Sequence, residues 1–458
     1  MSNRRKFLQG MAAVSGAAMV GTLGRLPKVL AYQEAPVQNR VLPAASESGI
    51  DHIVVVMMEN RSFDHFFGWI RNADGKQAGL TFNDPNGIPH STHHLAGDFI
   101  GCGHPDPDHS FQGGRIQYDN QLMDGFLLDA QNDDYALGYY TKPDRPFHNS
   151  LASHYTVCDR YFCSFLGPTF PNRMFSHAAQ TDRLSNTLTL STLPTIWDRL
   201  AAAGVSGTYY FSNLPFLALW GPKYVSISRP YQQFLLDAAA GTLPSVSFVD
   251  PKFTLTDTGD GNDDHPHADI RAGDAFLAQT FSAVANGPLW PRTVFVITYD
   301  EWGGFFDHVA PPRVAAGNRV DPDLVNGDAL LGFRIPVCIA SPFSARGPDN
   351  EQNDRHSSRV VSSLFDHTSV LKFIDWRWQL SSLTPRDASQ SITNLAHALQ
   401  FDHPDFSIPE LPLPPAAPPF SCVSPKTSLT SDKAAAREDN PWRSLLDSGL
   451  LDGWSVPL

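Results

Sequence analysis

The chain has 458 residues, of which 42% are hydrophobic and 18% charged, which is enough for a large buried core in one or two domains. Its formal net charge is −13, and residues 1–31 contain five basic and no acidic residues, so the rest carries 29 basic against 47 acidic side chains, or −18. Such an anionic body argues against nonspecific nucleic-acid binding, and contact with lipid should rely on local apolar or zwitterionic recognition.

Residues 1–31 have the pattern of a twin-arginine (Tat) export signal. The stretch "NRRKFLQG" precedes the apolar run "MAAVSGAAMVGTLG", and "VLA" ending at Ala31 suits a cleavage site. The run is too short to span a bilayer, and no other stretch is apolar enough, so we expect no transmembrane segment in the mature protein. The pattern predicts a periplasmic or secreted protein that uses the Tat machinery, which often exports folded proteins with a metal aboard. A disordered basic tail is the alternative.

Five cysteines occur in the chain, and the predicted compartment permits disulfides. They are Cys102, Cys158, Cys163, Cys338 and Cys422. The odd number leaves at least one unpaired within a monomer, and the spacing leaves the pairing open.

Four short apolar runs are typical of strands buried on both faces of a sheet. They are "HIVVVMM" from His52, "SVSFV" ending at Val249, "TVFVITY" ending at Tyr299 and "IPVCIAS" ending at Ser341. Helical patterns follow in "ADIRAGDAFLAQTFSAVAN" and "SVLKFIDWRW". Buried strands that alternate with helices predict an α/β domain over residues 45–405 with a mainly parallel central sheet.

Two regions depart from this alternation. Residues 71–150 are rich in Gly, Asp, Asn and His with weak periodicity, which predicts long loop insertions over one edge of the sheet. Residues 406–458 include the proline-rich stretch "PELPLPPAAPPF", which indicates a surface-wrapping or flexible C-terminal tail.

Polar side chains directly follow two of the predicted strands. Glu59 and Asn60 come after "HIVVVMM", and Asp300 and Glu301 come after "TVFVITY". Ligands collect at the carboxyl ends of parallel strands, and carboxylates buried there need a compensating cation. Carboxylate and amide oxygens suit a hard or borderline divalent metal, so these four residues are predicted metal ligands, with the identity of the metal open. The alternative is that Glu59 and Asp300 are helix caps or salt-bridge partners.

The stretch "LGPTFPNR" holds a single hydroxyl, that of Thr169, between two prolines. Read locally, Thr169 caps a helix in which Pro171 suits the first position. Beside a metal, the same hydroxyl becomes a nucleophile, and a helix N-terminus favours a phosphate group. Thr169 and the four predicted ligands would together perform in-line attack on a phosphoester.

Four histidines are candidate catalytic residues because a phosphoester site needs a proton donor for the leaving oxygen. His265 is the first candidate, since its loop follows the "SVSFV" strand. His109, His308 and His367 are the others, and all four are preceded by aspartate, which could orient the ring. For each one, a purely structural hydrogen-bonded role is the alternative.

Five segments in order resemble the bacterial phosphoesterase family, which holds phosphatidylcholine-type phospholipases C and a related metal-dependent acid phosphatase. They are "HIVVVMMENRSFDHFFG", "LGPTFPNR", "DHPHADIR", "YDEWGGFFDHV" and "SLFDHTSVLKFI". The longer stretch "DRYFCSFLGPTFPNR" is especially similar to the phospholipase C version. The resemblance implies an alkaline-phosphatase-like α/β/α sandwich, a nucleophile at Thr169 and a phosphate or leaving-group histidine at His265. It also implies metal contacts from Glu59, Asn60, Asp300 and Glu301.

The residues and the resemblance together predict an exported, metal-dependent phosphoric ester hydrolase, most simply a phospholipase C-like phosphodiesterase acting on a phospholipid or small phosphate ester. An acid phosphatase that uses the same site on monoesters is one alternative, and an exported binding protein with an inactive site is another. The outline "TFPNR" also resembles the sulfatase signature. Sulfatase chemistry is disfavoured because oxidation of threonine yields a ketone, whereas sulfatases use the aldehyde formylglycine.

Overall fold

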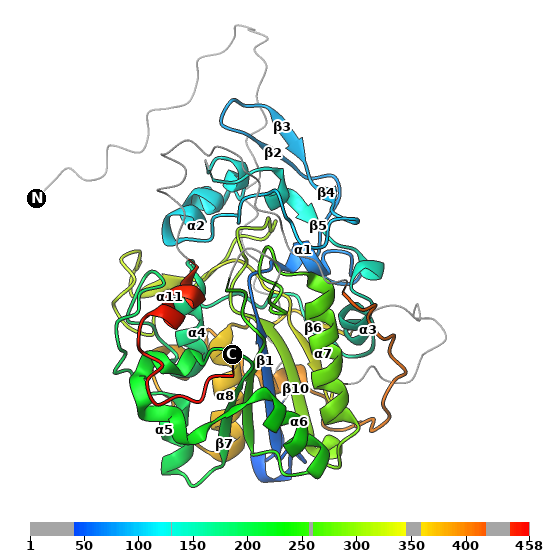
Figure 1. The fold of residues 1–458 in the computed structure, drawn as a ribbon, viewed down its shortest axis with the longest axis vertical. Coiled ribbons are helices and arrows are strands. Elements are labelled where there is room, and N and C mark those ends of the chain that lie inside the picture. Colours follow the sequence, from blue (N-terminus) through cyan, green and yellow to red (C-terminus); the bar gives the residue numbers. More distant parts are fainter. Residues whose placement is uncertain (1–40, 130, 256–259, 345–358, 418–439, 458) are drawn as a thin grey trace, which may run out of the picture. The chain divides into compact units, whose positions relative to one another are not determined.

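Strand β1 (His52–Met58) lies inside the main sheet, as its run of buried valines predicts (Figure 1). It pairs in parallel with β10 (Thr293–Tyr299) on one side and with β9 (Val246–Asp250) on the other. The export signal expected at residues 1–31 lies outside the described part of the chain. The computed structural model describes residues 41–129, 131–255, 260–344, 359–417 and 440–457.

Within these residues the main sheet has eight strands in the order β14-β6-β13-β10-β1-β9-β7-β8. The remaining strands are β14 (Arg359–Val361), β6 (Thr156–Cys158), β13 (Cys338–Ala340), β7 (Gly207–Phe211) and β8 (Ser228–Pro230). Strand β13 pairs antiparallel with both β10 and β6, whereas every other neighbouring pair is parallel. The predicted α/β class and mainly parallel sheet are therefore confirmed, and the one reversed strand lies in the run that ends at Ser341.

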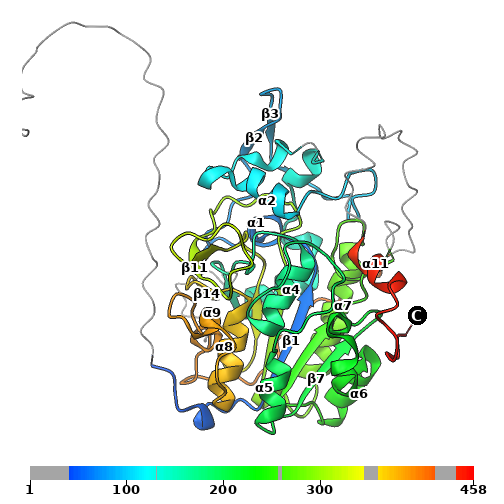
Figure 2. The same ribbon diagram turned by 90° about the vertical axis from the view of Figure 1, so that its left-hand side faces the viewer.

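Two groups of helices cover the two faces of this sheet (Figure 2). One group is α3 (Pro146–His154), α6 (Tyr231–Ala240) and α7 (Ile270–Ala285); the other is α4 (Thr169–Ala178), α5 (Ile196–Ala202) and α8 (His367–Trp378). Helices α7 and α8 each begin after an aspartate, Asp269 or Asp366, whose side chain accepts a backbone N–H of the first turn. Shorter helices are α1 (Phe63–Phe67), α9 (Pro385–Ala388) and α11 (Pro441–Asp447). None of the helices described is long and apolar enough to cross a membrane.

Residues 71–150, expected as long loops, build much of a small cap beyond the carboxyl end of β1 (Figure 1). The cap holds helix α2 (Phe111–Tyr118), the hairpin β2 (Thr81–Asn83) to β3 (Pro89–Ser91), and the pair β4 (His93–His94) and β5 (Gly138–Tyr139). Backbone hydrogen bonds from His267 to Ile100 and from Ile270 to Phe99 tie the cap to the start of α7. The weak periodicity of this region thus corresponds to short elements that cover the edge of the sheet where ligands are expected.

The C-terminal region is not uniformly a surface tail. Residues 406–417 are largely exposed, but residues 440–457 pack onto the core. Helix α11 buries Trp442 and Leu445, and Trp454 packs edge-on against Phe211 of β7. The sequence does not predict this contact, because isolated large side chains make it and no periodic apolar pattern marks the segment.

The turn after β10 requires glycine at two successive positions. Gly303 and Gly304 have φ of 65° and 72°, the left-handed conformation that costs other residues free energy. A Cβ on Gly303 would lie 2.3 Å from the carbonyl oxygen of Asn60, and one on Gly304 would lie 2.6 Å from Pro107 Cβ. The turn therefore packs the end of β10 against the segments that follow β1 and that precede His109.

We predict that Gly303→Ala destabilises the protein by about 1–3 kcal/mol more than Gly87→Ala. Both positions have positive φ, but only at Gly303 does the new methyl group meet backbone atoms; at Gly87, in the exposed β2–β3 turn, nothing lies within 4 Å. Urea denaturation of the two variants measures the difference. Equal free energies of unfolding would show that the close approach to Asn60 is not a constraint.

Candidate active site

Strands β1 and β10 end at the same level, because their last residues pair with each other. Glu59 directly follows β1 and Asp300 directly follows β10, so these two residues are neighbours. Asp300 Oδ1 accepts the backbone N–H groups of Asn60 at 3.1 Å and of Glu301 at 2.8 Å. All four side chains are fully buried. The structure thus brings the four predicted metal ligands together at one edge of the sheet, and we call them the acidic cluster.

A buried arginine on α4 joins these carboxylates. Arg173 Nε lies 3.1 Å from Glu59 Oε1 and 3.0 Å from Asp300 Oδ2. Its Nη1 lies 2.9 Å from Oδ1 of Asp250, the last residue of β9. The salt-bridge alternative for Glu59 and Asp300 is therefore observed, and it ties three parallel strands to one helix.

One guanidinium does not balance the charge of its surroundings. Glu59, Asp250, Asp300 and Glu301 offer four carboxylates, and Arg173 supplies one positive charge to this group. Burial, with the neighbouring Asp300, raises the pKa of Glu59 well above its usual range. Burial also raises the pKa of Glu301 to about 8. A further cation at this point would offset the excess negative charge.

Thr169 is the first residue of α4, and its hydroxyl is buried without a hydrogen-bond partner among the described residues. The N-cap is Pro168 and no side chain caps the helix, so Thr169 does not have the capping role that its local sequence suggests. Pro171 occupies the third helical position instead of the first, because the backbone is already helical at Thr169. Thr169 and Arg173 are four residues apart and so lie on the same face of α4, the face from which Arg173 reaches the acidic cluster.

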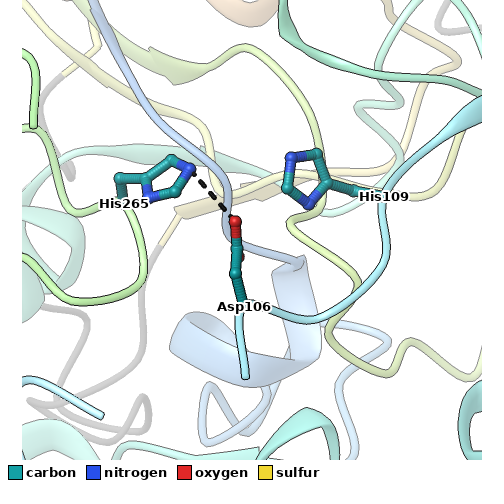
Figure 3. A group of neighbouring side chains, drawn as sticks. All are labelled: Asp106, His109 and His265. Carbon is teal, nitrogen blue, oxygen red and sulfur yellow. Dashed lines mark ion pairs between the residues drawn. The ribbon is translucent and has the colours of Figure 1, made fainter. Parts of the chain in front are cut away.

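Two of the predicted histidines flank Asp106 (Figure 3). His265 Nε2 lies 3.6 Å from Asp106 Oδ2, and the rings of His109 and His265 are 6.1 Å apart. Their Nδ1 atoms lie 2.8 Å from the carbonyl oxygen of Pro107 for His109 and 2.7 Å from that of Pro266 for His265. In the neutral rings Nδ1 therefore donates, so Nε2 is the ring nitrogen that carries the lone pair.

His109 connects this group to the acidic cluster. Its Nε2 lies 3.3 Å from Asn60 Nδ2 and 3.8 Å from Glu301 Oε1. The loop of His265 is also fixed there, because Asp263 accepts the N–H of His265 through its side chain and that of Glu59 through its carbonyl. Both histidines therefore belong to the same site as the predicted metal ligands.

The other two predicted histidines have different surroundings. His367 donates from Nε2 to the carbonyl oxygen of Asp300 at 2.7 Å, so it supports the backbone of the acidic cluster. Burial lowers its pKa. His308 pairs with Asp64 and Asp74 beside Arg334, in a second ion-pair network. The structure therefore does not bring the His308 side chain into contact with the cluster.

The residues present fit a divalent cation. Thr169 Oγ1, Asn60 Oδ1 and Glu301 Oε1 are buried and lack hydrogen-bond partners in the described part of the chain. Such oxygens are the ligands that hard cations prefer. Glu59 and Asp300 already bind Arg173, and their remaining lone pairs could also contribute.

A second set of possible ligands lies beside the first. The ligand atoms of Asp106, His109 and His265 lie within 4.8 Å of one another. Two imidazole nitrogens with one carboxylate oxygen suit a borderline cation.

Four residues of the site are not among those predicted from the sequence: Asp106, Arg173, Asp250 and Trp442. Asp250 directly follows the run "SVSFV", so the strand-end argument that identifies Glu59 could have identified it. Asp106 lies in an aperiodic loop. No sequence signal joins Trp442 to Glu59, although its indole N–H donates to Glu59 Oε2 across 383 residues.

The chain belongs to the phosphoesterase family, whose model matches residues 50–381. This family membership and the phospholipase C relatives make the protein a phosphoric ester hydrolase, as its sequence predicts. Non-specific phospholipase C1 of Arabidopsis thaliana is 31% identical over 79% of this chain and 73% of its own length. Phospholipase C B of Mycobacterium tuberculosis (strain ATCC 25618 / H37Rv) is 30% identical over 95% of this chain and 93% of its own length.

Likeness to solved structures is weaker. The match to a protein in the alkaline phosphatase superfamily from Vibrio parahaemolyticus spans 78% of this chain and 73% of that protein's chain, with 9% sequence identity and a TM-score of 0.35.

We predict that binding of Mn²⁺ to the metal-free protein tightens as pH rises, by up to about tenfold per unit below pH 8, and then levels off. The pKa of Glu301 is raised to about 8, so near pH 6 a proton occupies the carboxyl group that a cation would need. In the absence of a cation, the same shift makes the free energy of unfolding decrease as the pH rises from the ordinary carboxyl pKa to about 8. Calorimetric titration at several pH values measures the affinity.

Glu301→Gln should flatten this pH dependence. Asp375→Asn is the matched control. Asp375 on α8 is also a buried carboxyl with a pKa raised to about 8, but this residue lies outside the acidic cluster. An Mn²⁺ affinity that is independent of pH in the unmodified protein would contradict the role of Glu301.

Proposed function

We propose that the protein is an exported, metal-dependent phospholipase C-like phosphodiesterase with Thr169 as its nucleophile. The observation that carries the proposal is the Thr169 hydroxyl at the start of α4, which is buried and has no hydrogen-bond partner among the residues that the structure describes. It lies on the helix face from which Arg173 reaches the acidic cluster. Relatives named phospholipase C support a phospholipid substrate, and residues 1–31 support export.

The metal would be held by Asn60, Glu301 and the remaining lone pairs of Glu59 and Asp300. When bound, a divalent cation there lowers the pKa of the threonine hydroxyl and offsets charge on the phosphoryl oxygens. The N-terminus of α4 adds the positive end of its helix dipole at the same point. Arg173 holds Glu59 and Asp300 in place and is not free to bind substrate, because its donors already contact three carboxylates.

In the first step Thr169 Oγ1 loses its proton to solvent and attacks phosphorus, and the bond from phosphorus to the lipid alcohol breaks. The alcohol oxygen takes a proton from Nε2 of His265, with His109 beside it; each Nδ1 stays bound to a backbone carbonyl. In the second step His265 removes a proton from water, which attacks the phosphothreonine. The bond from phosphorus to Thr169 Oγ1 breaks, the phosphorylated head group leaves, and Oγ1 takes back a proton from solvent.

The diester substrate is favoured over a monoester by the engagement of Arg173. A monoester presents an additional unesterified oxygen that carries charge and requires a cationic donor. Arg173, which contacts the acidic cluster, is committed to Glu59, Asp250 and Asp300. The histidines alone suit the lower charge of a diester.

We predict that Thr169→Ala lowers kcat on p-nitrophenyl phosphorylcholine by at least about 10³-fold while the circular dichroism spectrum is unchanged. Thr169→Ser should retain measurable turnover because it keeps a hydroxyl. Ser176→Ala is the control on the same helix, since its buried hydroxyl only bonds the carbonyl of Arg173. Turnover by Thr169→Ala that matches Ser176→Ala would remove Thr169 as nucleophile.

We also predict that EDTA abolishes turnover and that added divalent ions restore it, with p-nitrophenyl phosphorylcholine cleaved faster than p-nitrophenyl phosphate. Steady-state rates on both substrates across pH measure this. Faster cleavage of the monoester would identify an acid phosphatase, and activity that is indifferent to chelators would contradict the metal.

A further inference from the structure

The C-terminal segment 440–457 reaches the acidic cluster through Trp442. This side chain is 1% exposed, and its indole N–H donates to Glu59 Oε2 at 3.0 Å. The other oxygen of Glu59, Oε1, binds Arg173. Both oxygens of a fully buried carboxylate are therefore oriented by named donors, one from α4 and one from the end of the chain.

Aromatic contacts hold the indole at this position. Its ring is stacked on Phe253, with ring centres 3.5 Å apart and planes at 8°. Its edge contacts Phe170, the neighbour of Thr169, at 5.3 Å and 70°. Trp442 thus touches residues beside the predicted nucleophile and after strand β9, as well as Glu59.

The segment is anchored independently on both sides of Trp442. Asn440 Nδ2 donates to the carbonyl oxygen of Thr254 at 3.0 Å, and its Oδ1 accepts the N–H groups that begin α11. Leu445 is fully buried, and Trp454 packs on Phe211. Because these contacts fix the segment, the hydrogen bond to Glu59 is an additional feature that anchoring does not require.

We propose that Trp442 is a positioning residue: its indole N–H holds Glu59 in the orientation that the active site uses, which makes the C-terminal segment part of the site. This inference rests on the proposed function for its catalytic consequence. The contact itself is independent of it. Glu59 without this donor would keep a buried oxygen unsatisfied and would be free to rotate away from Arg173 and Asp300.

The test compares two tryptophan-to-phenylalanine variants of the full chain in the presence of MnCl₂. Trp442→Phe keeps an aromatic ring against Phe253 and removes the N–H donor together with part of the ring system, a loss that the control variant shares. We expect kcat on p-nitrophenyl phosphorylcholine to fall about tenfold or more with KM unchanged. Trp454→Phe is the matched control, because its indole N–H is buried without a partner in the described structure. It should keep the kcat of the unmodified protein.

A second measurement reports the contact without turnover. Trp442 is the one indole of the described residues seen to donate to a carboxylate, so in protein labelled with ¹⁵N-tryptophan one indole signal should move strongly in Glu59→Gln. An unmoved set of indole signals overturns the inference, as does equal kcat in the two phenylalanine variants. If the unmodified protein cleaves neither phosphoester, the proposed function fails, and the indole signals still decide whether Trp442 binds Glu59.

Discussion

The Arg173 guanidinium is the interaction on which the arrangement of this protein's site depends. It is buried where strands β1, β9 and β10 end, and it contacts one carboxylate from each of them. Removing a charge from water costs several kcal/mol unless close partners replace the solvent, so the three strand ends and α4 are constrained to meet at this point. Thr169 lies one turn before Arg173 on α4, so the same constraint fixes the helix that carries it.

This network leaves an excess of negative charge that the protein alone does not satisfy. Glu59 and Glu301 respond with raised pKa values, and three buried oxygens of the site lack partners in the described residues. A bound cation would offset this excess charge and would supply partners for these oxygens. Stability and function are thus opposed in this region, while the apolar runs on both sides of it supply the stability.

Much of the fold could be predicted because its signals are local. The continuous apolar run of β1 and the periodic positions of α7 each identify an element without reference to distant residues. The reversal of β13 could not be predicted, because an apolar run of this length is equally compatible with either direction. The short helices and strands of the cap could not be predicted, because their sequences lack a periodic pattern of apolar residues.

The sequence by itself determined which polar side chains stand at the ends of the central strands, since chain order places Glu59 and Asp300 directly after buried runs. Only the tertiary structure decided which histidines share their site: His109 and His265 meet there, whereas His308 joins a separate network. It also brought Trp442 to Glu59 from the far end of the chain. The physical reason is that a burial pattern can be read from neighbouring residues. Ion pairs and hydrogen bonds between remote segments depend on distances that arise only when those segments pack.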